Sequence, residues 1–276
     1  STSLDERVRR VLVTVNTAAP AAGKRKVVLY ASCSGNYNKH EVGLAARAVL
    51  AKNGVETVVM HPACCGMPQL EVGDLAAVSA SAKKVAAEFA PMIDQGYDIV
   101  AMTPSCALML KFEWPLIAPK DPNVAKLAKA TRDVTEYVVE IAKKDGLAEG
   151  LKPVADPLAV HISCHSRAQN MGAKAAEMLR LIPSANLTVI ERCSGHGGAW
   201  GIETPNFPVA LKVGKPVFRR VMDIEGAVNA QVVSECPLAG DHIVQGVQEL
   251  DANAKPAPAL HPIQVLARSY GIEAPQ

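Results

Sequence analysis

The sequence predicts an α/β protein made of two similar halves, related by an approximate twofold axis, each with a small parallel sheet flanked by helices. Three observations lead to this prediction. The cysteines recur at a nearly constant interval, short runs rich in valine and isoleucine come just before them, and amphipathic helical patterns fill the stretches between. Strands that alternate with helices form parallel sheets with right-handed crossovers.

The interval between cysteines indicates an internal duplication. The seven cysteines fall into two groups, which are Cys33, Cys64, Cys65 and Cys106, then Cys164, Cys193 and Cys236. The offset is 131 residues from Cys33 to Cys164, 129 from Cys64 to Cys193 and 130 from Cys106 to Cys236. Offsets this uniform are typical of a repeated unit, here of about 130 residues.

Six apolar runs predict six strands. The first group of cysteines follows "KVVLYASC", "VETVVMHPACCG" and "YDIVAMTPSC", and the second follows "PLAVHISC", "NLTVIERCSG" and "NAQVVSEC". Short runs without alternation are typical of strands buried on both faces. Ligands of such sheets bind beyond the carboxyl ends of the strands, where every cysteine of this chain lies. Three strands of one sheet are therefore expected to bring Cys33, Cys64, Cys65 and Cys106 together.

Helical patterns separate these strands. Residues 39–54, 74–96 and 173–183 each read as a helix that ends at glycine or proline. Residues 122–146 predict one further amphipathic helix, with an apolar face formed by Val124, Leu127, Val134, Val138 and Ile141. The resulting division is an N-terminal helical lead (1–26), a first half (27–152) and a second half (153–276), joined by the Gly- and Pro-containing residues 145–157.

Composition and charge exclude several classes of protein. The net charge is +2 and no basic stripe alternates with aromatic residues, so nucleic-acid binding is not expected. No apolar run reaches the roughly 18–20 residues of a transmembrane helix, and the N-terminus lacks the pattern of a signal peptide. We therefore expect a cytoplasmic, reducing environment, in which cysteines act as ligands or redox groups more often than as disulfides.

Four converging thiolates predict a metal centre. Soft thiolates favour zinc, copper(I) or iron–sulfur clusters. Structural zinc sites usually take their ligands from CxxC pairs, whereas these cysteines come one or two per strand end. The adjacent Cys64 and Cys65 can reach different irons of a cluster but offer nothing to a single ion. The alternative, four buried cysteines that only pack, leaves the repeat unexplained.

The motifs also resemble a known family. In order, they are "SCSGNYN", "CCGMP", "TPSCALML", "SCHSRAQNMG", "MLRLIP", "RCSGHGGAWG", "LKVGKPVFRRV" and "HPIQVLA". From Lys26 onward, this series is similar to the duplicated cysteine-rich CCG domain of the heterodisulfide reductase B subunit, the anaerobic glycerol-3-phosphate dehydrogenase C subunit and the glycolate oxidase iron–sulfur subunit. The resemblance implies a 4Fe–4S type of iron–sulfur cluster at Cys33, Cys64, Cys65 and Cys106.

The chain departs from the family at three positions. Met109, Ser194 and Ala239 stand where relatives have cysteines. The first site thus keeps four thiolates, and the second keeps Cys164, Cys193 and Cys236. A histidine is then expected as the fourth ligand of a second iron–sulfur centre or a zinc ion at this site, as histidines serve in Rieske centres. His196 is preferred because it shares a loop with Cys193, His165 is a second candidate, and an empty site is the rival interpretation.

The resemblance implies an iron–sulfur electron-transfer subunit of an oxidoreductase complex. Such a subunit passes electrons between a partner dehydrogenase and a disulfide, a quinone or a carrier. Two alternatives remain open, namely a cluster-based disulfide reductase subunit that is itself an enzyme and a non-enzymatic metal-stabilised scaffold or sensor. The sequence has no flavin or nicotinamide fingerprint. The expected partner is therefore a flavin dehydrogenase or a ferredoxin-type iron–sulfur subunit, and any membrane association is peripheral, through that partner.

Overall fold

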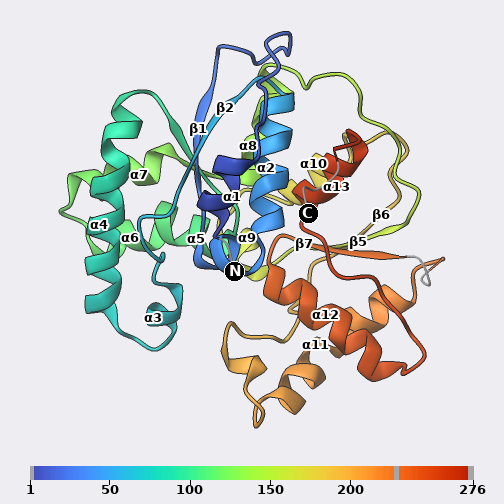
Figure 1. The fold of residues 1–276 in the computed structure, drawn as a ribbon. Coiled ribbons are helices and arrows are strands. Elements are labelled where there is room, and N and C mark those ends of the chain that lie inside the picture. The colour runs from blue at the N-terminus through green and yellow to red at the C-terminus, as the bar shows by residue number, and fades with distance from the viewer. Residues whose placement is uncertain (1–2, 227–229, 273–276) are drawn as a thin grey trace.

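Two small parallel sheets and the helices around them make up the fold in the computed structural model, which describes residues 3–226 and 230–272 (Figure 1). The α/β class predicted from the sequence is confirmed. None of the described helices is both long and apolar enough to cross a bilayer.

All strand pairs in both sheets are parallel. The first sheet has the order β2-β1-β3-β4 and the second has the order β6-β5-β7. The strands are β1 (Lys26–Tyr30), β2 (Glu56–Met60), β3 (Asp98–Ala101), β4 (Thr131–Asp133), β5 (Leu158–His161), β6 (Leu187–Ile190) and β7 (Gln231–Ser234). The six predicted strands are all present. The order β2-β1-β3 recurs as β6-β5-β7, as a duplicated sequence requires.

Helices cover both faces of each sheet. They are α1 (Leu4–Arg10), α2 (His40–Lys52), α3 (Met67–Glu71), α4 (Leu75–Asp94), α5 (Pro104–Leu108), α6 (Trp114–Ile117), α7 (Pro122–Ala130), α8 (Val134–Lys144), α9 (Cys164–Ala168), α10 (Lys174–Leu179), α11 (Phe207–Met222), α12 (Pro237–Leu250) and α13 (Pro262–Ser269). Three shorter helical segments of other types are η1 (Ser34–Asn38), η2 (Met109–Glu113) and η3 (Trp200–Ile202).

The largest apolar core lies between the two sheets. It combines side chains of α2 and α8 with those of α10 and α13, so both halves contribute to it (Figure 1). A second core packs α4 and α7 against the far face of the first sheet, and a third packs α11 and α12 against the far face of the second. One shared core therefore fixes the two sheets relative to each other.

The prediction of a single helix over residues 122–146 is wrong. The chain forms α7, then β4, then α8, and β4 extends the first sheet beside β3. Asp133 ends the strand and caps α8, because its carboxylate accepts the backbone N–H of Thr135 while Glu136 accepts the N–H of Asp133. Such a capping box starts a new helix. The pattern D-x-x-E in "DVTE" could have revealed this break.

The N-terminal helix packs on the rest of its own chain. Leu4 is fully buried, and its side chain occupies the space above Gly43 of α2, where an added Cβ would lie 2.3 Å from Leu4 Cδ2. Arg47 of α2 donates to the carbonyls of Val8 and Val11 at the end of α1. The helix spans only residues 4–10, because the following residues leave the helical conformation.

A buried histidine caps α13 and makes stability depend on pH. His261 Nδ1 accepts the backbone N–H of Ile263 at 3.1 Å, and burial lowers the pKa of His261 from 6.5 to about 3. Between these two values the unfolded chain binds a proton that the folded chain does not. Stability is therefore expected to fall as the pH drops from 6.5 towards 3.

The variant His261→Asn is expected to weaken this pH dependence. Asparagine keeps a side-chain acceptor at the N-cap but cannot take up the proton. Between pH 4 and 6, the free energy of unfolding should change less steeply than in the wild type, by about 1.4 kcal/mol per pH unit. Urea denaturation across this pH range measures both slopes, and equal slopes would contradict the assignment.

Candidate metal centre

The structure brings the four cysteines of the first group together at one edge of the first sheet. Cys33 follows β1 at the start of η1, Cys64 and Cys65 lie in the loop after β2, and Cys106 lies in α5 after β3. Because β1 lies between β2 and β3 and all three are parallel, their carboxyl ends adjoin. Topology alone thus gathers side chains that are up to 73 residues apart.

The four sulfurs form a continuous chain of contacts. Cys106 Sγ donates to Cys65 Sγ at 3.2 Å, and Cys64 accepts hydrogen bonds from the thiols of Cys33 and Cys65. These two bonds, with the backbone N–H of Gly66 at 3.4 Å, lower the pKa of Cys64. The hydrogen bond to Cys64 raises the pKa of Cys33. Cys64 is therefore the preferred thiolate of the group.

An apolar wall backs the site and holds its loop in place. Cys65 and Cys106 are buried in the second core beside Trp114 and Met109, whereas Cys33 and Cys64 are half-buried. Trp114 Nε1 donates to the carbonyl oxygen of Cys65 at 3.0 Å. Two hydroxyl groups also donate to carbonyl oxygens of this loop. The Tyr30 hydroxyl donates to the carbonyl of Ala63, and the Ser81 hydroxyl donates to the carbonyl of Cys64. The loop is thus fixed by the surrounding protein and leaves one side of the site near the surface.

The donor set fits an iron–sulfur cluster. Four soft sulfur ligands converge, and two of them are adjacent in the sequence, which suits a centre with several metal atoms. Met109, at the position of a fifth family cysteine, is buried in the core. In the described part of the chain, no three His, Cys, Asp or Glu side chains are arranged to hold a single metal ion.

The second group of cysteines is more open. Cys164 begins α9 and is exposed, Cys193 is exposed in the loop after β6, and Cys236 is half-buried at the N-cap of α12. Cys236 Sγ lies 3.9 Å from His196 Nε2, and Cys164 is near enough to interact electrostatically with Cys236. The hydrogen bond that Cys193 accepts in the described structure comes from the N–H of Gly195 in its own loop. Cys236 is therefore a neighbour of both His196 and Cys164.

Ser194 orients the candidate histidine ligand. Its hydroxyl lies 2.8 Å from His196 Nδ1, which leaves Nε2 directed to Cys236. Burial lowers the pKa of His196 to about 4, so the ring is neutral, and neutral imidazole is the form that binds metals. A hydrogen bond to the second nitrogen commonly fixes a histidine ligand. The serine that replaces a family cysteine thus has a role that the sequence did not suggest.

The other histidine candidate faces carboxylates. His165 is next to Cys164 in the sequence, but its electrostatic neighbours are Glu71 and Glu113 of the first half. Burial lowers the pKa of His165. Glu71 also lies against Gly198, because an added Cβ at Gly198 would be 2.4 Å from Glu71 Oε1. The end of α3, which follows Cys64 and Cys65, is therefore in contact with the loop that follows Cys193.

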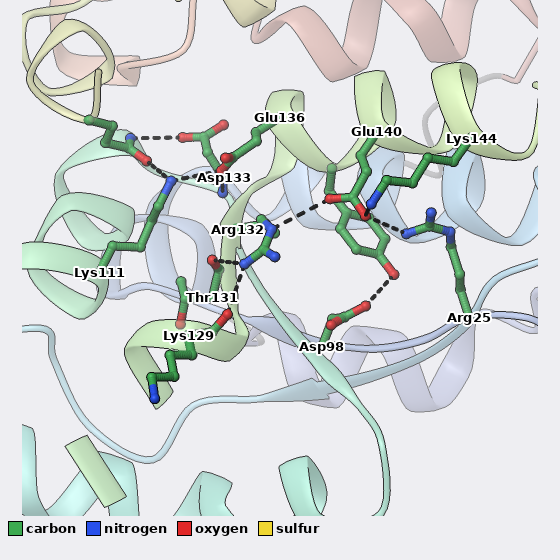
Figure 2. A network of polar contacts seen from close by, with 12 residues as sticks. Arg25, Asp98, Lys111, Lys129, Thr131, Arg132, Asp133, Glu136, Glu140 and Lys144 are labelled. Carbon is green, nitrogen blue, oxygen red and sulfur yellow. Dashed lines mark hydrogen bonds and ion pairs between the residues drawn. The ribbon is translucent and has the colours of Figure 1, made fainter. Parts of the chain in front are cut away.

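A buried polar network, also not predicted from the sequence, joins the two groups. Lys111 Nζ donates to Glu136 Oε2 at 2.7 Å. Figure 2 shows this bond beside Asp133. Gln169 donates to Asp133 and to the carbonyl of Pro104, two residues before Cys106. Thr135 Oγ1 lies 2.9 Å from both Asp133 Oδ1 and Glu235 Oε1. Glu235 directly precedes Cys236, so the network connects the Cys106 segment with the Cys236 segment.

The variant Thr135→Val is expected to lower the free energy of unfolding by about 1–3 kcal/mol, the usual cost of a buried polar group without a partner. The change keeps the shape of the side chain but removes the hydroxyl between two buried carboxyl groups. Urea denaturation measures the effect. Thr204→Val, at an exposed threonine, is the control and should stay near wild type. Equal effects in the two variants would contradict a stabilising role.

Residues 27–111 match the family model of the cysteine-rich domain called CCG. This segment contains all four cysteines of the first site, so the resemblance seen in the motifs is confirmed for this part of the chain.

The relatives include named subunits of a dehydrogenase and a reductase, a lactate utilization protein and an iron–sulfur protein of Methanocaldococcus jannaschii. The C subunit of anaerobic glycerol-3-phosphate dehydrogenase from Escherichia coli K12 is 28% identical over 229 residues, which cover 79% of this chain and 54% of that relative. Lactate utilization protein A of Bacillus cytotoxicus is 29% identical, over 64% of this chain and 75% of that protein. The B subunit of the CoM/CoB fumarate reductase of Methanothermobacter marburgensis is 25% identical, over 81% of this chain and 42% of that relative.

These alignments leave part of the relatives unmatched. The chain spans about half of the length of the E. coli relative. Among solved structures, the glutamate racemase RacE1 of Bacillus anthracis is 10% identical with a TM-score of 0.36, over 91% of this chain and 84% of that one. This similarity is too distant to inform function.

Proposed function

We propose that the chain is an iron–sulfur electron-transfer subunit of an oxidoreductase complex. The observation that supports this most directly is the chain of four thiols at the carboxyl edge of the first sheet. The relatives add support, because they include subunits of a dehydrogenase and a reductase and a protein named for iron–sulfur content. The partner is a flavin dehydrogenase or a ferredoxin-type iron–sulfur subunit.

The residues of the first site divide the tasks of holding and insulating a cluster. Cys33, Cys64, Cys65 and Cys106 would hold it, and when bound it would supply a one-electron redox centre of the 4Fe–4S type. Trp114 and Met109 exclude water from the inner side. The half-buried Cys33 and Cys64 keep the outer side within reach of a partner. Burial and hydrogen bonds to sulfur set the reduction potential of such a centre.

For the second site we propose Cys164, Cys236 and His196 as ligands, with Cys193 joining them when a metal is bound. The metal is a smaller iron–sulfur centre or zinc, and binding a single zinc ion requires these side chains to rearrange, because those that the structure describes are not placed to hold one ion. The hydrogen bond between Ser194 Oγ and His196 Nδ1 and the neutral imidazole of His196 support this assignment.

Metal analysis of anaerobically purified protein tests these proposals. Iron, sulfide and zinc are measured per chain, and EPR spectra are recorded for wild type, Cys193→Ala and His196→Ala. A first-site cluster requires iron and sulfide in the wild type, and protein without iron would overturn the electron-transfer role. If both variants lose a second EPR signal or lose zinc, the result supports a metal at the second site. If the wild type contains only enough iron for one cluster and no zinc, the second site is empty. No turnover of small disulfides is expected, and such turnover would instead favour a reductase subunit.

A further inference from the structure

A basic groove lies between α11 and the carboxyl end of β6. Its volume is about 640 Å³. Five cations line it together with only two carboxylates, Glu191 and Asp223. The cations are Arg192, Lys212, Lys215, Arg219 and Arg220. The groove belongs to the second half of the chain, whose helix α11 lies near the lower edge of the fold in Figure 1.

The cations of the groove have no ion-pair partners among the described residues. Two less exposed cations elsewhere are ion-paired, Arg25 with Asp145 and Lys111 with Glu136. Lys212, Lys215 and Arg219 follow a helical spacing that places them on one face. Like charges held this close raise the local potential and attract anions.

Apolar side chains accompany these charges. Val209 and Val213 of α11 are about half-exposed, at 49% and 48%, beside the basic face of the helix and outside the groove itself. Trp200 and Ile202 of η3, which precedes the helix, are also exposed. A small anion would use only the charges. Exposed aromatic side chains together with arginine are instead enriched at protein–protein interfaces.

The groove adjoins the second cysteine group. Arg192, one of its cations, directly precedes the exposed Cys193. We propose that the groove docks an acidic electron-carrier protein and thereby places that carrier beside the second site. This inference rests on the proposed electron-transfer function. Charge complementarity would speed the encounter and fix the orientation of the carrier.

The double variant Lys212→Glu/Lys215→Glu tests the docking role. The probe is an acidic [2Fe–2S] ferredoxin, titrated against the purified chain at low and high salt. The double variant should bind at least about tenfold more weakly than wild type at low salt, and the wild-type affinity should fall with salt, because surface charge interactions are screened. The control Lys83→Glu/Lys84→Glu makes the same charge change on exposed residues of α4 and should bind as the wild type does.

Other results would overturn the inference. Equal weakening in the control would show a general effect of net charge. If the wild type does not bind ferredoxin but does bind phosphatidylglycerol vesicles, and the groove variant loses that vesicle binding, the groove is a membrane-binding surface. Binding of inorganic phosphate alone would assign it to a small anion. Iron content and EPR spectra of the same samples test the proposed function separately, because charge reversal on α11 should leave both unchanged.

Discussion

Replacing Cys64 by serine is expected to remove most of the iron from the protein. Cys64 lies in the middle of the first site, where it accepts hydrogen bonds from Cys33 and Cys65. Loss of a partner that merely positions a metal ligand typically weakens metal binding by about 10- to 100-fold, and loss of a ligand should cost at least as much. Because metal binding is coupled to folding, the free energy of unfolding should fall as well.

Iron and sulfide content per chain, measured after anaerobic purification, checks this expectation. The matched control is Cys164→Ser, which makes the same chemical change at an exposed cysteine of the second group. That control should retain the EPR signal of the first site. Comparing the two variants separates the first site from a general sensitivity to cysteine loss. Unchanged iron content in Cys64→Ser would contradict the assignment of the first site.

The apolar runs made it possible to predict the clustering of the cysteines from the sequence. Each run predicted a buried parallel strand, and parallel strands align their carboxyl ends regardless of how far apart they lie in the chain. Only that rule was needed to place Cys33 near Cys106, and the sulfur contacts agree with it. His196 Nε2 lies 3.9 Å from Cys236 Sγ, and its choice as a ligand, made because it shares a loop with Cys193, stays a prediction.

Features that depend on contacts between the two halves could not be predicted from the sequence. Thr135 and Glu235 are 100 residues apart, and neither has a local pattern that marks it as a partner of the other. The break at Thr131–Asp133 was missed because the apolar spacing of the two helices happens to continue across it. The basic face of α11 was read only as part of a family motif, although Lys212, Lys215 and Arg219 already had the spacing of one helical face.

The variant Gly195→Ala is expected to destabilise the second site selectively. Gly195 has a φ of +93°, which favours glycine. A Cβ at this position would lie 2.2 Å from the carbonyl oxygen of Ala210 and 2.7 Å from the amide nitrogen of Gly214, both in α11. These are backbone atoms of a helix and cannot move aside cheaply. The loop that carries Cys193, Ser194 and His196 would therefore have to shift.

Gly73→Ala separates the clash from the backbone strain. Gly73 has a similar φ of +82°, but an added Cβ there meets no atom within 4 Å. The strained backbone should lower the free energy of unfolding of both variants by at least about 1 kcal/mol. Overpacking should lower that of Gly195→Ala by about 1–3 kcal/mol more. Gly195→Ala alone should also lose the metal or EPR signal of the second site, while the first site keeps its iron. Equal losses of stability in the two variants, with the second signal intact, would mean that the loop does not depend on its contact with α11.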